Sequence, residues 1–139
     1  PFGNVEVDGE ACTLCMACVA VCPVGALDGG GEQPQLLFHE DRCVQCGLCE
    51  RTCPEDAIRL APRMDFAAHV QPGARLVNEE PMHHCPSCGK AFAPRKAIER
   101  MQARLAGHWM FQDTGAFVPL ELCGECRAAH MHAQGGSHV

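Results

Sequence analysis

Residues 12–23 read Cys-Thr-Leu-Cys-Met-Ala-Cys-Val-Ala-Val-Cys-Pro, and residues 43–54 read Cys-Val-Gln-Cys-Gly-Leu-Cys-Glu-Arg-Thr-Cys-Pro. Both stretches follow one pattern: three cysteines are separated by two residues each, and a fourth follows after three more, directly before proline. These two stretches contain eight of the 12 cysteines of the chain. Two copies of so specific a pattern rarely arise by chance, so they decide how residues 1–62 fold.

The spacing is that of the cysteine ligands of a 4Fe–4S cluster, which needs a thiolate at each of its four irons. Three cysteines two residues apart allow one tight loop to wrap three corners of the cluster. The fourth cysteine, followed by proline, points away from that loop. Gly47 follows the second cysteine of one run and could let a backbone N–H approach a cluster sulfur. Met16 stands at the matching position of the other run, so we hypothesise that the two clusters differ in reduction potential.

The two runs belong to an internal repeat, in which Cys12 matches Cys43 and every later cysteine of the first run matches its counterpart in the second. Each half predicts a short strand, a cluster loop, a helical turn after the Cys-Pro pair, and a return strand. Pro23 and Pro54 suit the first turn of a helix, where a missing N–H costs little. The strands are expected near residues 5–7, 26–28, 36–38 and 58–60.

Residues 3–62 resemble the bacterial two-cluster 4Fe–4S ferredoxins, on all eight cysteines and both trailing prolines. The resemblance implies an α+β fold with pseudo-twofold symmetry, one-electron transfer, and a fourth cysteine in each run that ligates the other cluster. The implied ligand sets are Cys12, Cys15, Cys18 and Cys53 for one cluster, and Cys43, Cys46, Cys49 and Cys22 for the other.

The composition suits a small protein that is stabilised by metal sites. Aromatic residues make up 5% of the 139 residues and tyrosine is absent, so a large aromatic core is excluded. A disulfide scaffold of a secreted protein would also use many cysteines. Metal-ligand spacing, however, accounts for all 12 of them.

The net charge of −6 is distributed unevenly along the chain. Residues 1–62 carry ten Asp and Glu against three Arg, whereas residues 63–139 carry eight Lys and Arg against seven Asp and Glu. The acidic charge of residues 1–62 would allow docking to a basic patch on a redox partner. It is equally consistent with a surface that is only solvated and binds no partner. Neither half is basic enough to predict nucleic-acid binding.

A second motif pair lies at Cys85-Pro-Ser-Cys88 and Cys123-Gly-Glu-Cys126. Two Cys-x-x-Cys turns predict a tetrahedral four-thiolate site, as in zinc ribbons. The separation between Cys88 and Cys123 exceeds the usual spacing, and a helix inserted at 94–107 explains the excess. Structural zinc is the expected metal. A single iron, or a redox-active dithiol, is the alternative.

These motifs divide the chain into a 2×4Fe–4S domain at 1–62, a linker at 63–81, a zinc-ribbon-like domain at 82–128 and a flexible tail at 129–139. Residues 108–111, with Phe117, Val118, Leu120 and Leu122, are expected to fill the small core of the ribbon. With four thiolates available, the histidines beside Cys85 and in the tail are expected not to bind the metal.

We find no catalytic constellation in the sequence, and therefore expect an electron carrier rather than an enzyme. The chain begins at Pro1, which suggests a domain of a longer oxidoreductase protein or complex whose partners are redox proteins. The alternative is a redox-sensing regulator that uses the ribbon to bind a partner.

The sequence shows no signal peptide and no apolar run long enough for a membrane span. We therefore expect the protein in the cytoplasm, or at the cytoplasmic face of a membrane complex.

Overall fold

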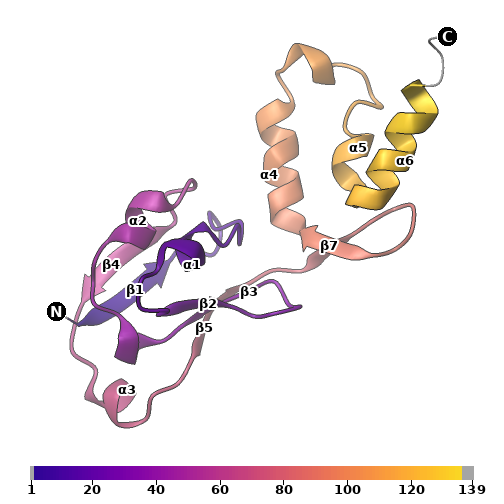
Figure 1. Ribbon diagram of the computed structural model, residues 1–139. Helices are drawn as coiled ribbons and strands as arrows, with labels where there is room; N and C mark the ends of the chain where they lie inside the picture. The colour runs from indigo at the N-terminus through magenta and orange to yellow at the C-terminus, as the bar shows by residue number, and fades with distance from the viewer. Residues whose placement is uncertain (1, 136–139) are drawn as a thin grey trace. The chain divides into compact units, whose positions relative to one another are not determined.

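The computed structural model describes residues 2–135, and the chain folds as two compact units, Pro1–Glu80 and Pro81–Val139. The first unit is a mixed α/β structure of short elements (Figure 1). They are β1 (Gly3–Val7), α1 (Ala17–Val21), β2 (Leu27–Gly29), β3 (Gln35–Phe38), the 3-10 turn η1 (Glu40–Arg42), α2 (Leu48–Thr52), β4 (Ile58–Pro62), α3 (Phe66–Val70) and β5 (Arg75–Glu79).

The four strands expected from the repeat are confirmed, within two residues of their predicted ends. The helices differ from the prediction, because α1 and α2 end just before the fourth cysteine of each run instead of starting after Cys-Pro. Cys22 and Cys53 have extended backbones. A residue that precedes proline is driven out of the helical conformation, so each helix has to end at this cysteine.

Strands pair between the two halves of the repeat rather than within a half. β1 runs antiparallel to β4, with Val7 opposite Ile58, and β2 runs antiparallel to β3, with Leu27 opposite Phe38. The pairs are extended by two matching hydrogen bonds, from Asp8 N–H to the Ala57 carbonyl at 2.8 Å and from His39 N–H to the Ala26 carbonyl at 2.7 Å. Neither half can therefore complete its pairing without the other.

The core of the first unit is built from alternate residues of these strands and from the cysteine loops. In β3, Leu36 and Phe38 point inward and are each 1% exposed. Ile58 is equally buried, and Val5 and Leu27 lie in the same cluster. Each such side chain contributes about 1.5–3 kcal/mol to folding. Buried cysteines complete the cluster, so the cysteine loops form one wall of the core.

The segment expected to be a linker, residues 63–81, instead belongs almost entirely to the first unit. β5 pairs antiparallel with β3 and makes a three-stranded sheet in the order β2-β3-β5. Asp65 caps α3 by accepting hydrogen bonds from the N–H groups of Ala67 and Ala68. The physical reason is that β3 would otherwise leave a row of unpaired backbone groups at its edge. The short sequence of β5 carries no periodic signal for this pairing.

A half-buried ion pair ties this added segment to the repeat. The carboxylate of Glu40, with 9% of its side chain exposed, accepts two hydrogen bonds of 2.6 Å from the guanidinium of Arg63. Arg63 N–H also donates to the carbonyl of Phe2. Fork-like pairing of this kind is stronger than a single ionic contact, and it satisfies a carboxylate that has little access to water.

We expect Arg63→Met to destabilise the first unit, because the carboxylate of Glu40, with 9% of its side chain exposed, would lose its two hydrogen-bond donors. The effect is measured as a lower midpoint of anaerobic thermal unfolding, followed by the iron–sulfur absorbance. Arg59→Met is the matched control, because its ion pair with Asp56 has both side chains more than half exposed and should lower the midpoint much less. Equal shifts for the two variants would contradict a special role for the Glu40 pair.

The second unit is a short hairpin followed by helices. Its elements are β6 (Met82–His84), β7 (Ala91–Pro94), α4 (Arg95–Leu105), the 3-10 turn η2 (Trp109–Phe111), α5 (Val118–Glu121) and α6 (Gly124–Gly135). The predicted helix is confirmed in α4, which begins after Pro94 and ends shortly before Gly107 and buries Ile98. β6 and β7 pair antiparallel, so the Cys85–Cys88 turn closes a hairpin.

The rest of this unit departs from a ribbon. The second pair of cysteines lies at the start of α6, not on a second hairpin. α6 extends through residue 135, so residues 129–135 are helical, and the remainder of the expected flexible tail lies outside the described residues. Of the residues expected in the core of this unit, Leu122 is confirmed, whereas Trp109 and Met110 are 74% and 60% exposed and do not fill it. Cys85 and Cys123 complete the buried cluster, with Phe92 and Cys126 packed against it.

Candidate metal centres

The two cysteine loops of the first unit have the same backbone. Leu14 and Met16 have the left-handed conformation, and so do Gln45 and Gly47, which stand at the matching positions of the second run. For residues other than glycine this conformation costs roughly 1–2 kcal/mol, so both loops are held in a tight curve that something else must stabilise. Because Met16 and Gly47 share this conformation, the backbone there offers no difference between the two loops.

Each loop encloses a cavity that also receives a cysteine from the other half. One cavity is lined by Cys12, Cys15, Cys18 and Cys53, and is called the Cys12 site below. The other is lined by Cys43, Cys46, Cys49 and Cys22, and is called the Cys43 site. The two cavities are similar in size, and each brings together three cysteines of one loop and one of the other.

Backbone N–H groups stabilise negative charge on the cysteine that crosses between halves. Ala26 N–H donates to the Cys22 sulfur at 3.2 Å, and Ala57 N–H donates to the Cys53 sulfur at 3.3 Å. These two bonds again occupy matching positions in the repeat. Hydrogen bonds from N–H to sulfur are one of the means by which proteins hold iron–sulfur clusters and set their potentials.

Without a cation between them, one cysteine thiol in each loop resists losing its proton. Burial, followed by the charges of Cys12 and Cys15, raises the pKa of the Cys18 thiol to about 12. Burial is also the main cause of the raised pKa of Cys49, where a backbone N–H from Glu50 acts in the opposite direction. A bound metal reverses this effect on a thiol. The four sulfurs of each cavity therefore fit a cationic iron–sulfur group.

The four cysteines of the second unit form a tighter group. The sulfur atoms of Cys85, Cys88, Cys123 and Cys126 all lie within 4.8 Å of one another. Such close spacing of four sulfurs suits a single ion held between them.

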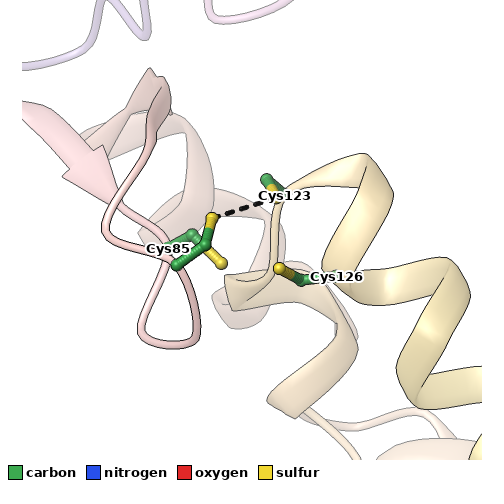
Figure 2. A group of neighbouring side chains, drawn as sticks. Cys85, Cys123 and Cys126 are labelled. Atoms are coloured by element: carbon green, nitrogen blue, oxygen red, sulfur yellow. Dashed lines mark hydrogen bonds between the residues drawn. The ribbon is translucent and has the colours of Figure 1, made fainter.

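The distances in the second unit match a tetrahedral ion. A bond of about 2.3 Å from zinc to sulfur places two ligands of a tetrahedron about 3.8 Å apart. The sulfur atoms of Cys88 and Cys123 are 3.7 Å apart. Figure 2 shows Cys85 on the hairpin turn facing Cys123 and Cys126 at the start of α6, with their sulfurs around a common centre. Cys85 and Cys123 are buried, whereas Cys88 is exposed.

Hydrogen bonds prepare this site to bind a cation. Burial opposes the ionisation of Cys85, but backbone N–H groups of Cys123, Cys88 and Ser87 outweigh it and lower its pKa to about 6. The Ser87 hydroxyl lowers the pKa of Cys126, but hydrogen bonds with the sulfurs of Cys123 and Cys88 outweigh it and raise that pKa to about 12. The N–H groups around Cys85 therefore favour its thiolate, which is the form that binds metal.

Some residues beside these sites were missed by sequence reasoning. Gln45 Nε2 lies 3.4 Å from the Cys43 sulfur. His83 Nε2 lies 3.0 Å from the carbonyl of Glu121 and so braces the hairpin against the segment before α6. The repeat contained a signal for Gln45, because a polar residue there matches Leu14 in the first half. No sequence signal joins His83 to a carbonyl 38 positions away.

Comparison with known proteins agrees with this geometry. Residues 11–57 match the family described as the 4Fe-4S dicluster domain. Ferredoxin-1 of Caulobacter vibrioides is 44% identical over 52 residues, which cover 36% of this chain and 44% of that protein. The pyruvate synthase subunit PorD of Thermotoga maritima is 39% identical over 59 residues, covering 41% of this chain and 57% of the subunit.

The polyferredoxin protein MvhB of Methanothermobacter marburgensis is 34% identical over 74 residues, which cover 43% of this chain but only 18% of that protein. The chain therefore spans less than two thirds of the length of each of these relatives. Two of them are named as a ferredoxin and a polyferredoxin, and the third as a subunit of pyruvate synthase.

Residues 11–57 thus form a ferredoxin-like 4Fe–4S electron-transfer segment. No constellation of nucleophile and base that would indicate a catalytic domain is evident within the described residues. No helix among them is both long enough and apolar enough to cross a lipid bilayer.

Proposed function

We propose that the chain is an electron-transfer module that carries two 4Fe–4S clusters and works within a larger oxidoreductase protein or complex. One cluster would be held by the Cys12 site and the other by the Cys43 site. The observation that carries this proposal is the composition of the two cavities, each of which combines three cysteines of one loop with the fourth cysteine of the other. The arrangement of the strands supports a pseudo-twofold dicluster ferredoxin fold.

A bound 4Fe–4S cluster supplies one-electron chemistry, and the residues of this chain provide the surroundings. The cysteines anchor the clusters, and the N–H groups of Ala26 and Ala57 donate to the ligands that cross between halves. Buried Leu14 and Ile58 exclude water from the Cys12 site, as Phe38 does from the Cys43 site.

The relative that is named as a subunit of pyruvate synthase supports a protein partner. The acidic segment 1–62 suits a basic patch on that partner, which would bring the proteins together by an attraction that salt weakens. We also propose a reducing location, the cytoplasm or the cytoplasmic face of a membrane complex, because thiolate clusters persist under such conditions.

For the second unit we propose structural zinc, held by Cys85, Cys88, Cys123 and Cys126. The four-thiolate set and the tetrahedral spacing support zinc, and a single iron is the alternative that the same ligands accept. Zinc does not change its oxidation state, so the second unit would stabilise or dock the module and would not carry electrons.

The test of this function is metal and sulfide analysis of protein purified without oxygen, followed by electron-transfer measurements. We expect about eight iron, about eight labile sulfide and about one zinc per chain. Dithionite should reduce both clusters, which an electron paramagnetic resonance spectrum would detect. Cytochrome c, as a generic acceptor, should then reoxidise them.

Little iron and sulfide after anaerobic purification and reconstitution would overturn the two-cluster proposal. About nine iron without zinc would keep electron transfer but overturn the structural role of the second unit. Clusters that are reduced by dithionite but are not reoxidised by cytochrome c would contradict the carrier function.

A further inference from the structure

The side-chain amide of Gln45 lies between the Cys43 sulfur and a backbone carbonyl. Its Nε2 atom is 3.0 Å from the carbonyl oxygen of Asn4 and 3.4 Å from the Cys43 sulfur. Both of these atoms accept hydrogen bonds, and an amide NH2 carries two hydrogens. One N–H can therefore point at each acceptor.

The opposite orientation of this amide is excluded by the same two partners. It would place the amide oxygen against the Asn4 carbonyl and the Cys43 sulfur, which are both negative. Gln45 Oε1 is buried and has no hydrogen-bond partner among the described residues, so the oxygen end does not select the orientation. The Asn4 carbonyl thus fixes an N–H toward the sulfur.

The neighbouring backbone is shaped to hold the amide in this place. A Cβ atom at Gly3 would lie 2.5–2.8 Å from the amide group of Gln45, so glycine leaves the room that the amide occupies. Asn4 itself is buried, and its side-chain oxygen accepts a hydrogen bond from Arg75 of β5. The added third strand therefore braces the residue whose carbonyl orients Gln45.

The Cys12 site has no equivalent donor in the described part of the chain. The residue that matches Gln45 there is Leu14, which is 5% exposed and lines the cavity with an apolar side chain. Thr13 also lines that cavity, but among the described residues its hydroxyl makes no hydrogen bond to a cysteine sulfur. The backbone donors to Cys22 and Cys53 are the same in both sites, so the Gln45 amide is the side-chain hydrogen-bond donor that distinguishes the Cys43 site among the described residues. The two linings also differ in charge, because Glu55 of the Cys12 site matches Val24 of the Cys43 site, and a carboxylate there lowers the potential of the cluster at the Cys12 site.

We propose that Gln45 raises the reduction potential of the cluster at the Cys43 site above that of the cluster at the Cys12 site. The proposal rests on the two-cluster function above. Reduction adds one electron from a low-potential donor and no proton, so the four-thiolate unit gains one negative charge. A hydrogen bond to a ligand sulfur stabilises that added charge and thereby raises the potential. A single electron on the chain therefore resides at the Cys43 site.

The test copies each residue into the other half of the repeat. Gln45→Leu removes the donor and should lower the potential of the cluster at the Cys43 site. The potential of the cluster at the Cys12 site should stay unchanged, so that the gap between the two potentials becomes smaller. Leu14→Gln should raise the potential of the cluster at the Cys12 site. Potentials are measured by anaerobic titration followed by electron paramagnetic resonance. The Cys β-proton signals in the NMR spectrum of the half-reduced protein identify the cluster that holds the electron.

Thr13→Val is the matched control, because it copies Val44 of the second half into the first and leaves Gln45 in place. It should leave the gap between the potentials unchanged. The proposal is overturned if both potentials of Gln45→Leu equal those of the wild-type chain. It is also overturned if Thr13→Val changes the gap between the potentials as much as Gln45→Leu does.

Iron and sulfide are measured for every variant, so that failure of this proposal can be told apart from failure of the proposed function. A full complement of both clusters with unchanged potentials rejects only the role of Gln45. A wild-type chain that never holds two clusters rejects the function itself. Gln45→Met, which fills nearly the same space but has neither an N–H donor nor a charge, should lower the potential as well and shows that the donor, not the volume, matters.

Discussion

Replacing Cys53 with alanine is expected to empty the Cys12 site, so that iron falls from about eight to about four atoms per chain. The decisive comparison is between two double variants. Cys12→Ala with Cys53→Ala should lose no more iron than Cys53→Ala alone, because both residues line the same cavity. Cys43→Ala with Cys53→Ala should lose nearly all of the iron, because each change removes a ligand from a different cavity.

Independent runs would give the reverse result. If each run held its own cluster, Cys43→Ala with Cys53→Ala would leave about four iron, and Cys12→Ala with Cys53→Ala would leave none. The two schemes therefore predict opposite orders for the same pair of proteins. Cys22→Ala, combined in turn with Cys12→Ala and Cys43→Ala, repeats the comparison from the other half. Cys88→Ala controls for the loss of any cysteine, because it should lower zinc and leave iron unchanged.

Loss of the metal is expected to unfold the second unit. Apart from the metal ligands, the buried hydrophobic side chains among residues 81–135 are Ile98 and Leu122, which cannot hold a hairpin and several helices together. Structural zinc contributes roughly 10–16 kcal/mol of apparent binding free energy in small domains. Cys123→Ser should therefore remove zinc and abolish the dispersed NMR signals of α4 and α6. The iron–sulfur absorbance of the first unit should remain, because the clusters use other cysteines.

His84→Ala is the matched control for this experiment, because His84 is exposed and stands directly beside Cys85. It should keep its zinc and its folded signals. Zinc loss in His84→Ala would show that a histidine takes part in binding. Normal folding of metal-free Cys123→Ser would contradict a structural role for the ion.

The spacing of local elements was largely predictable from the sequence. The offset between the two cysteine runs predicted where the strands lie, and the proline and glycine at the ends of 94–107 predicted α4. These are short-range effects, in which a residue type restricts its own backbone or that of its neighbours. Proline has a second effect of this kind, which the prediction overlooked: it forces the preceding cysteine into an extended conformation and so ends the helix before it.

Other features depend on contacts between distant residues and carried no local signal. β5 joins the sheet only because β3 offers an unpaired edge. Cys123 and Cys126 were predicted to share a site with Cys85 and Cys88, but the helix that holds them was not predicted. Trp109 was expected in the core by its hydrophobicity, yet its ring is 74% exposed, and the buried cluster of that unit is Cys85, Leu122 and Cys123.

The sequence by itself determined the cysteine loops, the twofold repetition and the kind of metal chemistry, because ligand type and spacing restrict these directly. Only the tertiary structure decided which cysteines line one cavity and which way the Gln45 amide points. A cavity is closed by residues from both halves, and an amide is oriented by an acceptor 41 positions away, at Asn4. Such arrangements follow from how the chain packs in three dimensions, which local sequence patterns do not specify.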